Sequence, residues 1–188
     1  AAIPSVANPH IISDYCIAAS QPVASVCLFS DVPLNEIKEI LVDYQSNTSA
    51  ALLRILLKQF WKIDPVLIDT SNGYQQNIKG TTAGLIIGDR ALTQRKHSAY
   101  IYDLAEAWQQ MTGLPFVFAA WVANKKLSES FITEFNSTTA IGLAHLDEIV
   151  AATNFKEYDM MTYYSKNIDY KLNKEKKEGM NLFSSLLS

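Results

Sequence analysis

Cysteine is scarce in this sequence, which argues against a disulfide framework or a zinc site. Cys16 and Cys27 are the only cysteines among 188 residues, and each stands in an apolar run. A disulfide framework needs more cysteines, and a zinc site needs clustered ligands. We therefore expect two buried free thiols in a reducing compartment.

The sequence also lacks a run of about 18 apolar residues, which a helix needs in order to cross a membrane. No signal peptide is visible, and the chain opens as Ala1-Ala2-Ile3-Pro4-Ser5, without methionine or a clear first element. We expect no membrane partner, and we expect the chain to begin inside a larger fold.

Motifs of several common catalytic classes are missing as well. No P-loop, GxGxxG, GxSxG or CxxC occurs, so a nucleotide cofactor and a covalent serine or cysteine nucleophile are unsupported. His10, His97 and His145 lie far apart and form no cluster with ligand spacing. We expect neither a metal nor a cofactor.

Charge is low and slightly negative. The net charge is -3, and 19% of the residues are charged. No basic patch predicts a nucleic-acid partner, and the lysine-rich stretch 171–177 also contains glutamate, as solvated helix faces do. Apolar residues make up 48% of the chain, enough for one large domain or two small lobes with a buried core.

Short apolar runs alternate with helical segments. The clearest helix carries leucines and an aromatic residue at helical spacing behind a cluster of capping residues, in the range 46–60. Apolar and β-branched runs predict strands over 22–30, 40–42, 66–68, 85–87 and 115–122. This alternation predicts an α/β fold with a mainly parallel sheet.

The start of that helix is rich in hydroxyl groups. Ser46, Thr48 and Ser49 cluster where a helix exposes unpaired N–H groups and a partial positive charge. Such a start suits a carboxylate or phosphate. Plain N-capping, which needs only one of the three residues, explains the cluster equally.

Two acidic positions follow predicted strands. Asp89 comes directly after the strand 85–87, where ligands bind in open α/β sheets. It could hold a ligand hydroxyl, or it could cap the next turn while Arg90 pairs on the surface. Asp103 and Glu106 lie three apart at the start of a helix that runs to Met111, and N-capping is favoured there over a catalytic carboxylate pair.

Four strings and the tail carry a family resemblance. The strings are PVASVCLFS (22–30), SNTS (46–49), IIGDRAL (86–92) and YDLAEAWQQMTGLPFVFAAWV (102–122). Together they resemble the chorismate dehydratase family of the futalosine route to menaquinone. Three positions depart from the family pattern: Gln21 and Ala105 replace glycines, and Asn47 replaces an arginine that would be a carboxylate partner.

The resemblance implies a two-lobed fold like that of type II periplasmic binding proteins, with the N-terminal part of the first lobe missing. The family begins with a strand and a Tyr-Leu-Asn-x-x-Pro-like motif, whereas this chain starts at the family's Ala-Ala-Ile-Pro. Residues 1–32 would form the partial first lobe and a crossing strand, and 33–114 the second lobe. Residues 115–188 would form the return crossing strand and the C-terminal helices of the first lobe, so that 22–30 and 115–122 cross at the hinge.

The resemblance also implies an activity. The chain would be a cytoplasmic carbon–oxygen lyase (hydro-lyase) that converts chorismate to 3-[(1-carboxyvinyl)oxy]benzoate and water in menaquinone biosynthesis. Ser46, Thr48 and Ser49 would hold a substrate carboxylate, Ser25 would be the catalytic contact, and Asp89 a further binding residue. The base would be the substrate's own side-chain carboxylate, with no metal or redox cofactor.

Other functions fit the same resemblance. One is the sister enzyme, 1,4-dihydroxy-6-naphthoate synthase, and another is a non-enzymatic solute-binding protein for a small carboxylate. A purely structural fragment is a third. The string FVFAAWV (116–122) favours the dehydratase, and the sequence leaves the oligomeric state open.

Overall fold

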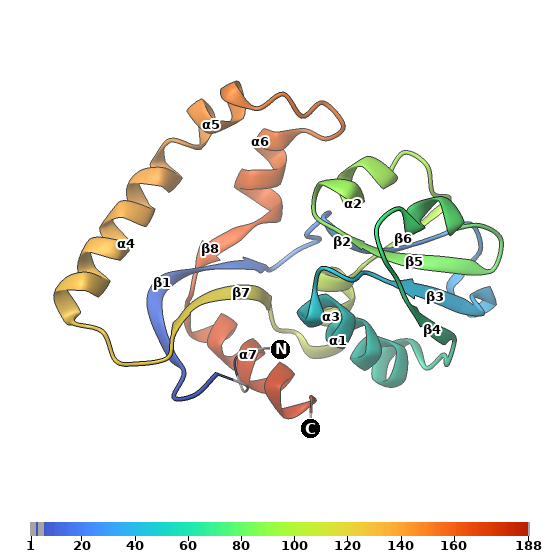
Figure 1. Cartoon of the computed structure of the whole chain (residues 1–188), viewed down its shortest axis with the longest axis horizontal. Helices are drawn as coiled ribbons and strands as arrows, with labels where there is room; N and C mark the ends of the chain where they lie inside the picture. Colours follow the sequence, from blue (N-terminus) through green and yellow to red (C-terminus); the bar gives the residue numbers. More distant parts are fainter. Residues whose placement is uncertain (1–2, 4–5, 188) are drawn as a thin grey trace.

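The computed structural model describes residues 3 and 6–187 and contains two separate β-sheets (Figure 1). The five-stranded sheet lies to the right in Figure 1 and the three-stranded sheet to the left. Most of the opening Ala-Ala-Ile-Pro string lies outside the described residues. The chain is thus a mixed α/β protein, as predicted.

The five-stranded sheet has the order β4-β3-β5-β2-β6. Its strands are β2 (Val26–Ser30), β3 (Glu39–Val42), β4 (Val66–Asp69), β5 (Thr82–Ile87) and β6 (Tyr100–Asp103). β3 runs parallel to β4 and β5, whereas β2 runs antiparallel to β5 and β6. Four of the five strands therefore run in one direction, as a mainly parallel sheet requires, but β2 enters between β5 and β6 in the opposite direction and makes the sheet mixed.

Three helices follow strands of this sheet. They are α1 (Asn47–Leu56), which continues as a π-helical turn (Leu57–Trp61), α2 (Asp89–Gln94) and α3 (Leu104–Thr112), with short 3-10 turns at Leu34–Glu36 and Tyr74–Asn77. Leu52, Leu53 and Leu56 of α1 are fully buried in one core with the strands. Burial of each such leucine contributes about 1.5–3 kcal/mol, so the predicted apolar face of this helix is confirmed.

The three-stranded sheet has the order β7-β1-β8, and both of its pairings are antiparallel. Its strands are β1 (His10–Ala19), β7 (Phe116–Ala123) and β8 (Asp169–Lys171). The helices α4 (Glu129–Ala144), α5 (Leu146–Ala152) and α6 (Met160–Thr162) form an arc from this sheet towards α2 (Figure 1). α6 continues as a π-helical turn (Tyr163–Asn167), and α7 (Lys174–Ser185) packs on β7.

An aromatic cluster joins the two sheets. Trp108 of α3 lies edge-on to Phe116 of β7, with ring centroids 5.3 Å apart, and Phe183 of α7 packs on both. All three side chains are buried. Edge-to-face aromatic pairs add about 0.5–1.5 kcal/mol each beyond the area they bury, so this cluster holds α3 against β7.

The division of the chain at 32/33 and 114/115 stays a prediction, but the strand pairing corrects one detail. We expected the strand within 22–30 to cross between lobes. Instead β2 lies inside the five-stranded sheet, with all five of its residues buried. Hydrogen bonds to β5 on one side and β6 on the other fix it there, so the connecting segment is Ser20–Ser25.

Both cysteines are free and buried, as predicted. Burial raises the pKa of Cys16 to about 11 and that of Cys27 well above its usual value. Thiolate is therefore scarce at neutral pH. None of the described helices is long and apolar enough to cross a membrane.

Gly179 allows α7 to approach the backbone that leads into β7. A Cβ atom at this position would clash with the carbonyl oxygen of Pro115. We expect Gly179→Ala to lower the free energy of unfolding by about 1–3 kcal/mol, because a backbone atom must move. Gly142→Ala is the control, since its Cβ meets open space on α4, and we expect it to stabilise by about 0.5–1 kcal/mol. Urea denaturation measures both, and equal effects would contradict the close approach.

Candidate functional site

One edge of the five-stranded sheet gathers the starts of three helices. β3, β5 and β6 end at this edge, and β2 begins there. α1, α2 and α3 follow those three strands after short connections or none. We call it the helix-start edge. Ligands of open α/β sheets bind beyond the carboxyl ends of strands, so this is where the predicted site residues are expected to meet.

The hydroxyl cluster at the start of α1 is partly a cap. Ser46 is the N-cap, and its Oγ accepts a hydrogen bond from the Ser49 amide at 3.1 Å. The Ser46 hydroxyl donates to Ser49 Oγ at 2.9 Å, and Ser49 is buried. Thr48 is half-buried on the first turn. The capping interpretation is confirmed for Ser46, while the role of the cluster towards an anion stays a prediction.

Asp89 does not cap the helix that it begins. Gly88 is the N-cap of α2, with a φ of 64°, and no side chain caps the helix there. Asp89 is exposed. The alternative that Asp89 caps the following turn was therefore wrong, because the turn needs a left-handed residue that glycine supplies. The side chain remains available at the helix-start edge.

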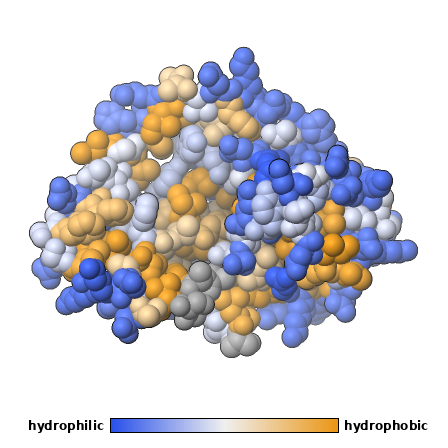
Figure 2. Space-filling model, in the orientation of Figure 1, coloured by the Kyte–Doolittle hydropathy of each residue, from blue (hydrophilic) through white to orange (hydrophobic). Residues whose placement is uncertain are grey.

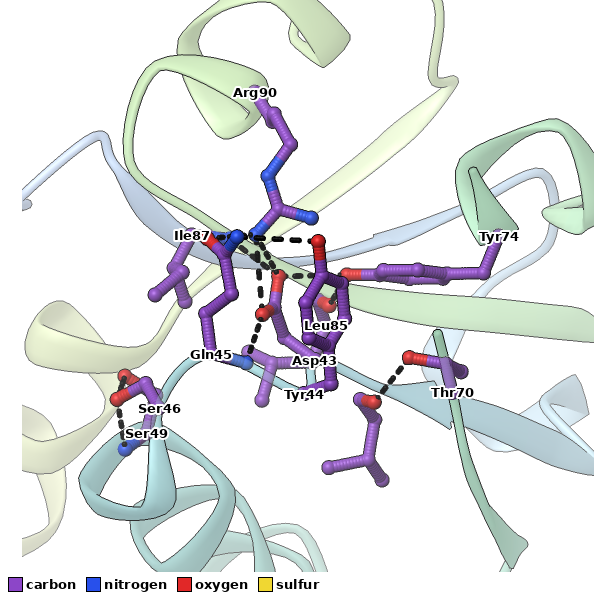
Figure 3. Close-up of polar contacts among 11 residues, drawn as sticks. Asp43, Tyr44, Gln45, Ser46, Ser49, Thr70, Tyr74, Leu85, Ile87 and Arg90 are labelled. Carbon is purple, nitrogen blue, oxygen red and sulfur yellow. Dashed lines mark hydrogen bonds and ion pairs between the residues drawn. The ribbon is translucent and has the colours of Figure 1, made fainter. Parts of the chain in front are cut away.

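A buried carboxylate joins the starts of α1 and α2 (Figure 3). Asp43, directly after β3, accepts hydrogen bonds from Arg90 Nη2 at 2.8 Å and from the Tyr74 hydroxyl at 2.8 Å. The backbone amide of Gln45 donates to it at 2.8 Å. Its side chain is fully buried, whereas that of Arg90 is 28% exposed. The expectation of a surface pair for Arg90 was wrong, because its partner is a buried residue 47 positions earlier in the chain.

Arg90 also contacts the loop before α1. Nη2 donates to Gln45 Oε1 at 2.8 Å, and the guanidinium lies over the Tyr44 ring at 5.4 Å from the centroid. Burial, followed by the hydrogen bond to Asp43, raises the pKa of Tyr74, so its hydroxyl stays protonated. Neither Asp43 nor Tyr74 was predicted from the sequence. The signal available was an aspartate placed directly after a predicted buried strand.

Ser25 lies where β2 begins, and its backbone is held on both sides. The Ser25 carbonyl accepts from the Gly88 amide at 2.8 Å, and the amide of Ala24 donates to Asp103 at 2.7 Å. Ala24 has a φ of 63°, which a residue with a Cβ seldom adopts. Ser25 is buried, and the hydroxyl of Tyr163 donates to its Oγ at 2.9 Å. Tyr163 was missed because no local pattern marks it.

Asp103 is the N-cap of α3, as predicted. Its carboxylate accepts from the amides of Ala105 at 3.0 Å and Glu106 at 3.2 Å. Burial raises its pKa, although the backbone N–H groups oppose the shift. Both acceptor oxygens are engaged with the backbone, so Asp103 supports the site and does not pair with Glu106 as a catalytic acid.

The candidate residues thus divide into two groups at one edge. Ser25, Gly88 and Asp89 lie together at the β2–β5 junction, and Ser46, Thr48 and Ser49 begin α1. The ion pair of Arg90 with Asp43 links α2 to the loop before α1. Figure 2 shows the face of the molecule recessed near its middle, between the parts built on the two sheets. The described residues contain no group of three or more histidine, cysteine or acidic side chains that could hold a metal ion.

The described residues also line cavities elsewhere, among them two with different linings. One of about 590 Å³ is lined by Arg54, Lys58, Lys62 and neighbours beyond the C-terminal end of α1. The other, of about 370 Å³, lies between the three-stranded sheet and α4 and is lined by Tyr15, Trp121 and other mostly apolar residues. Neither includes a predicted site residue, so the site rests on the geometry of the helix-start edge.

Comparison with known proteins gives concordant results. A family model described as menaquinone biosynthesis matches residues 1–188. A chorismate dehydratase from Thermus thermophilus is 25% identical over 199 aligned positions, which cover 94% of this chain and 73% of the relative. A crystal structure of protein AF1704 from Archaeoglobus fulgidus superposes with a TM-score of 0.70 at 13% identity, over 95% of this chain and 72% of that one. This last likeness shows the fold alone.

The ion pair between Asp43 and Arg90 can be tested through stability. Asp43→Asn keeps the shape but removes the charge and places an amide N–H among hydrogen-bond donors. We expect the free energy of unfolding to fall by about 2 kcal/mol, because buried charged hydrogen bonds are lost. Glu157→Gln, in the exposed pair with Lys96, is the control and should change little. Equal losses of unfolding free energy for both variants in urea denaturation would show that the buried pair stabilises the fold no more than the exposed pair does.

Proposed function

Because the chain belongs to the menaquinone biosynthesis family, we propose that it catalyses the dehydration of chorismate to 3-[(1-carboxyvinyl)oxy]benzoate. The reaction makes the chain a carbon–oxygen lyase. The single observation that carries the proposal is the grouping of hydroxyl side chains and helix starts at the helix-start edge, in a chain similar to a chorismate dehydratase.

The substrate explains why such a site is suitable. Chorismate carries two carboxylates and a ring hydroxyl. The start of α1 offers a partial positive charge and the hydroxyls of Ser46, Thr48 and Ser49. Neutral donors of this kind bind a carboxylate without adding a charged side chain to the site. We assign these three residues to a substrate carboxylate.

The chemistry needs little beyond binding and exclusion of water. The C–H bond at the ring carbon that bears the enolpyruvyl ether breaks, the C–O bond of the neighbouring hydroxyl breaks, and a C=C bond forms between the two carbons. The ring carboxylate makes that hydrogen acidic through the conjugated double bond, and aromaticity drives the elimination. The proton passes to the substrate's side-chain carboxylate and from there to the departing hydroxyl, which leaves as water. Positioned donors supply the remaining stabilisation.

We assign Ser25 to contact with the reacting atoms. We assign Asp89, beside it, to binding of the substrate. Both adjoin Gly88, whose amide donates to the Ser25 carbonyl at 2.8 Å. The backbone of Ser25 is therefore fixed, and its hydroxyl can be held within hydrogen-bond distance of the substrate. Asp89 is exposed and suits a substrate hydroxyl.

We also propose the two-lobed architecture that the resemblance implies, like that of type II periplasmic binding proteins, and a cytoplasmic location. The presence of two sheets joined through Ser20–Ser25 and the start of β7 supports the architecture. In such a fold the substrate would lie between the lobes, which is where Tyr163 of the arc meets Ser25.

The activity test is direct. Incubation of the protein with chorismate, followed by liquid chromatography and mass spectrometry, should show loss of one water and formation of 3-[(1-carboxyvinyl)oxy]benzoate. Chorismate that is bound and recovered unchanged would favour a solute-binding protein. No binding and no turnover would favour the sister activity, for which cyclic dehypoxanthinyl futalosine is the substrate to test.

The site assignment is tested by Ser25→Ala and Thr48→Ala. We expect each to lower kcat/KM about tenfold or more, because each removes a hydrogen bond to a charged or reacting group. Thr48→Ser keeps the hydroxyl and is the control. Far-UV circular dichroism checks that the fold is intact, and unchanged steady-state kinetics in both alanine variants would refute the assignment.

A further inference from the structure

We propose that Tyr163 is a positioning residue, whose hydroxyl donates to Ser25 Oγ and thereby directs the Ser25 hydroxyl hydrogen at the substrate. The proposal rests on the proposed function and extends it to a residue 138 positions away from Ser25 in the chain. It starts from the direction of one hydrogen bond.

A serine hydroxyl has one hydrogen to donate and an oxygen that accepts. The Tyr163 hydroxyl, 2.9 Å away, donates to the Ser25 oxygen. The Ser25 hydrogen therefore points elsewhere, and within the described part of the chain it has no acceptor. Burial raises the pKa of Tyr163, so this hydroxyl keeps its hydrogen at neutral pH. A buried donor whose hydrogen has no acceptor is suited to a ligand oxygen.

Rotation of this hydroxyl is the one freedom that Ser25 retains. Its backbone amide donates to Val23 O at 2.8 Å, its carbonyl accepts from Gly88, and the preceding residue is fixed by Asp103. The Cβ position is thus determined by β2, α2 and α3 together. The Tyr163 bond is the contact that removes the rotational freedom, because a hydroxyl that accepts on one side donates on the other.

The segment that carries Tyr163 is itself anchored beside Ser25. The side-chain amide of Asn167 donates to the Pro22 carbonyl at 2.8 Å. Met160 packs with Ala24 and Leu92 in a small buried cluster. The Tyr163 ring lies 6.3 Å from that of Tyr158 and 5.2 Å from that of Tyr164. These contacts place the phenol hydroxyl with little freedom, as a positioning residue requires.

In the proposed reaction the oriented Ser25 hydroxyl donates a hydrogen bond to the departing hydroxyl group. Negative charge develops on that oxygen as the C–O bond lengthens, so the bond is stronger in the transition state than in the bound substrate. A contact of this kind raises kcat and leaves KM nearly unchanged.

The test is a double-mutant cycle on turnover of chorismate. We expect Tyr163→Phe to lower kcat about tenfold with KM within about twofold. In the Ser25→Ala background the same change should have no further effect, because the residue it orients is gone. Tyr164→Phe is the matched control. It removes the same atom from the adjacent tyrosine, whose hydroxyl makes no hydrogen bond within the described residues, and should retain wild-type kcat.

A tenfold loss that persists in the Ser25→Ala background would overturn the proposal, as would a Tyr163→Phe enzyme that matches Tyr164→Phe. Melting temperatures of the same proteins test the bond without reference to turnover: the shifts of Ser25→Ala and Tyr163→Phe should be non-additive. Additive shifts contradict the Tyr163–Ser25 bond alone. If the melting-temperature shifts of the two variants are non-additive but the wild-type protein leaves chorismate intact, the hydrogen bond stands and the proposed function alone is contradicted.

Discussion

The buried carboxylate of Asp103 is the interaction on which the geometry of the site depends. One of its oxygens accepts the amides of Ala105 and Glu106, which begin α3, and the other accepts the amide of Ala24 and the thiol of Cys27. It thereby holds the turn before β2 in a left-handed conformation at Ala24. Desolvation raises its pKa, and the backbone donors that surround it lower the cost of keeping it ionised. Without this carboxylate the turn would lack a partner for a buried amide, and the position of Ser25 would not be fixed.

A second buried carboxylate, that of Asp43, likewise holds a loop in place at the same edge. Asp43 ties the loop before α1 to Arg90 of α2. This use of Arg90 has a consequence for binding, because its charge is already opposed by a buried anion. In the proposed function the start of α1, where Asn47 stands in place of an arginine, would attract the substrate carboxylate with helix N–H groups and hydroxyls. Such a site depends on the placement of neutral dipoles, and hydrogen-bond geometry matters more there than net charge.

The C-terminal part of the chain contributes side chains to the candidate site from outside the five-stranded sheet. Tyr163 and Asn167 reach Ser25 and Pro22 on one short stretch, while the cluster of Trp108, Phe116 and Phe183 holds the two sheets together at the other end. The stretch Ser20–Ser25 between these anchors carries no regular secondary structure. Hydrogen bonds from Tyr163 and Asn167 to Ser25 and Pro22 hold this stretch in place.

The local structure follows from the amino-acid sequence. A cap within the cluster Ser46–Ser49, the cap at Asp103, the apolar face of α1 and the strands β2, β3, β4, β5 and β7 were predicted, because each follows from residues within a few positions of one another. The family resemblance likewise placed Ser25 and the start of α1 among the candidate residues. Long-range packing, in contrast, makes β2 run antiparallel between β5 and β6, pairs Asp43 with Arg90, and brings the Tyr163 hydroxyl to Ser25. Those contacts join residues 47 to 138 positions apart in the chain, and no local pattern fixes which distant partners meet when the strands pair and the helices pack.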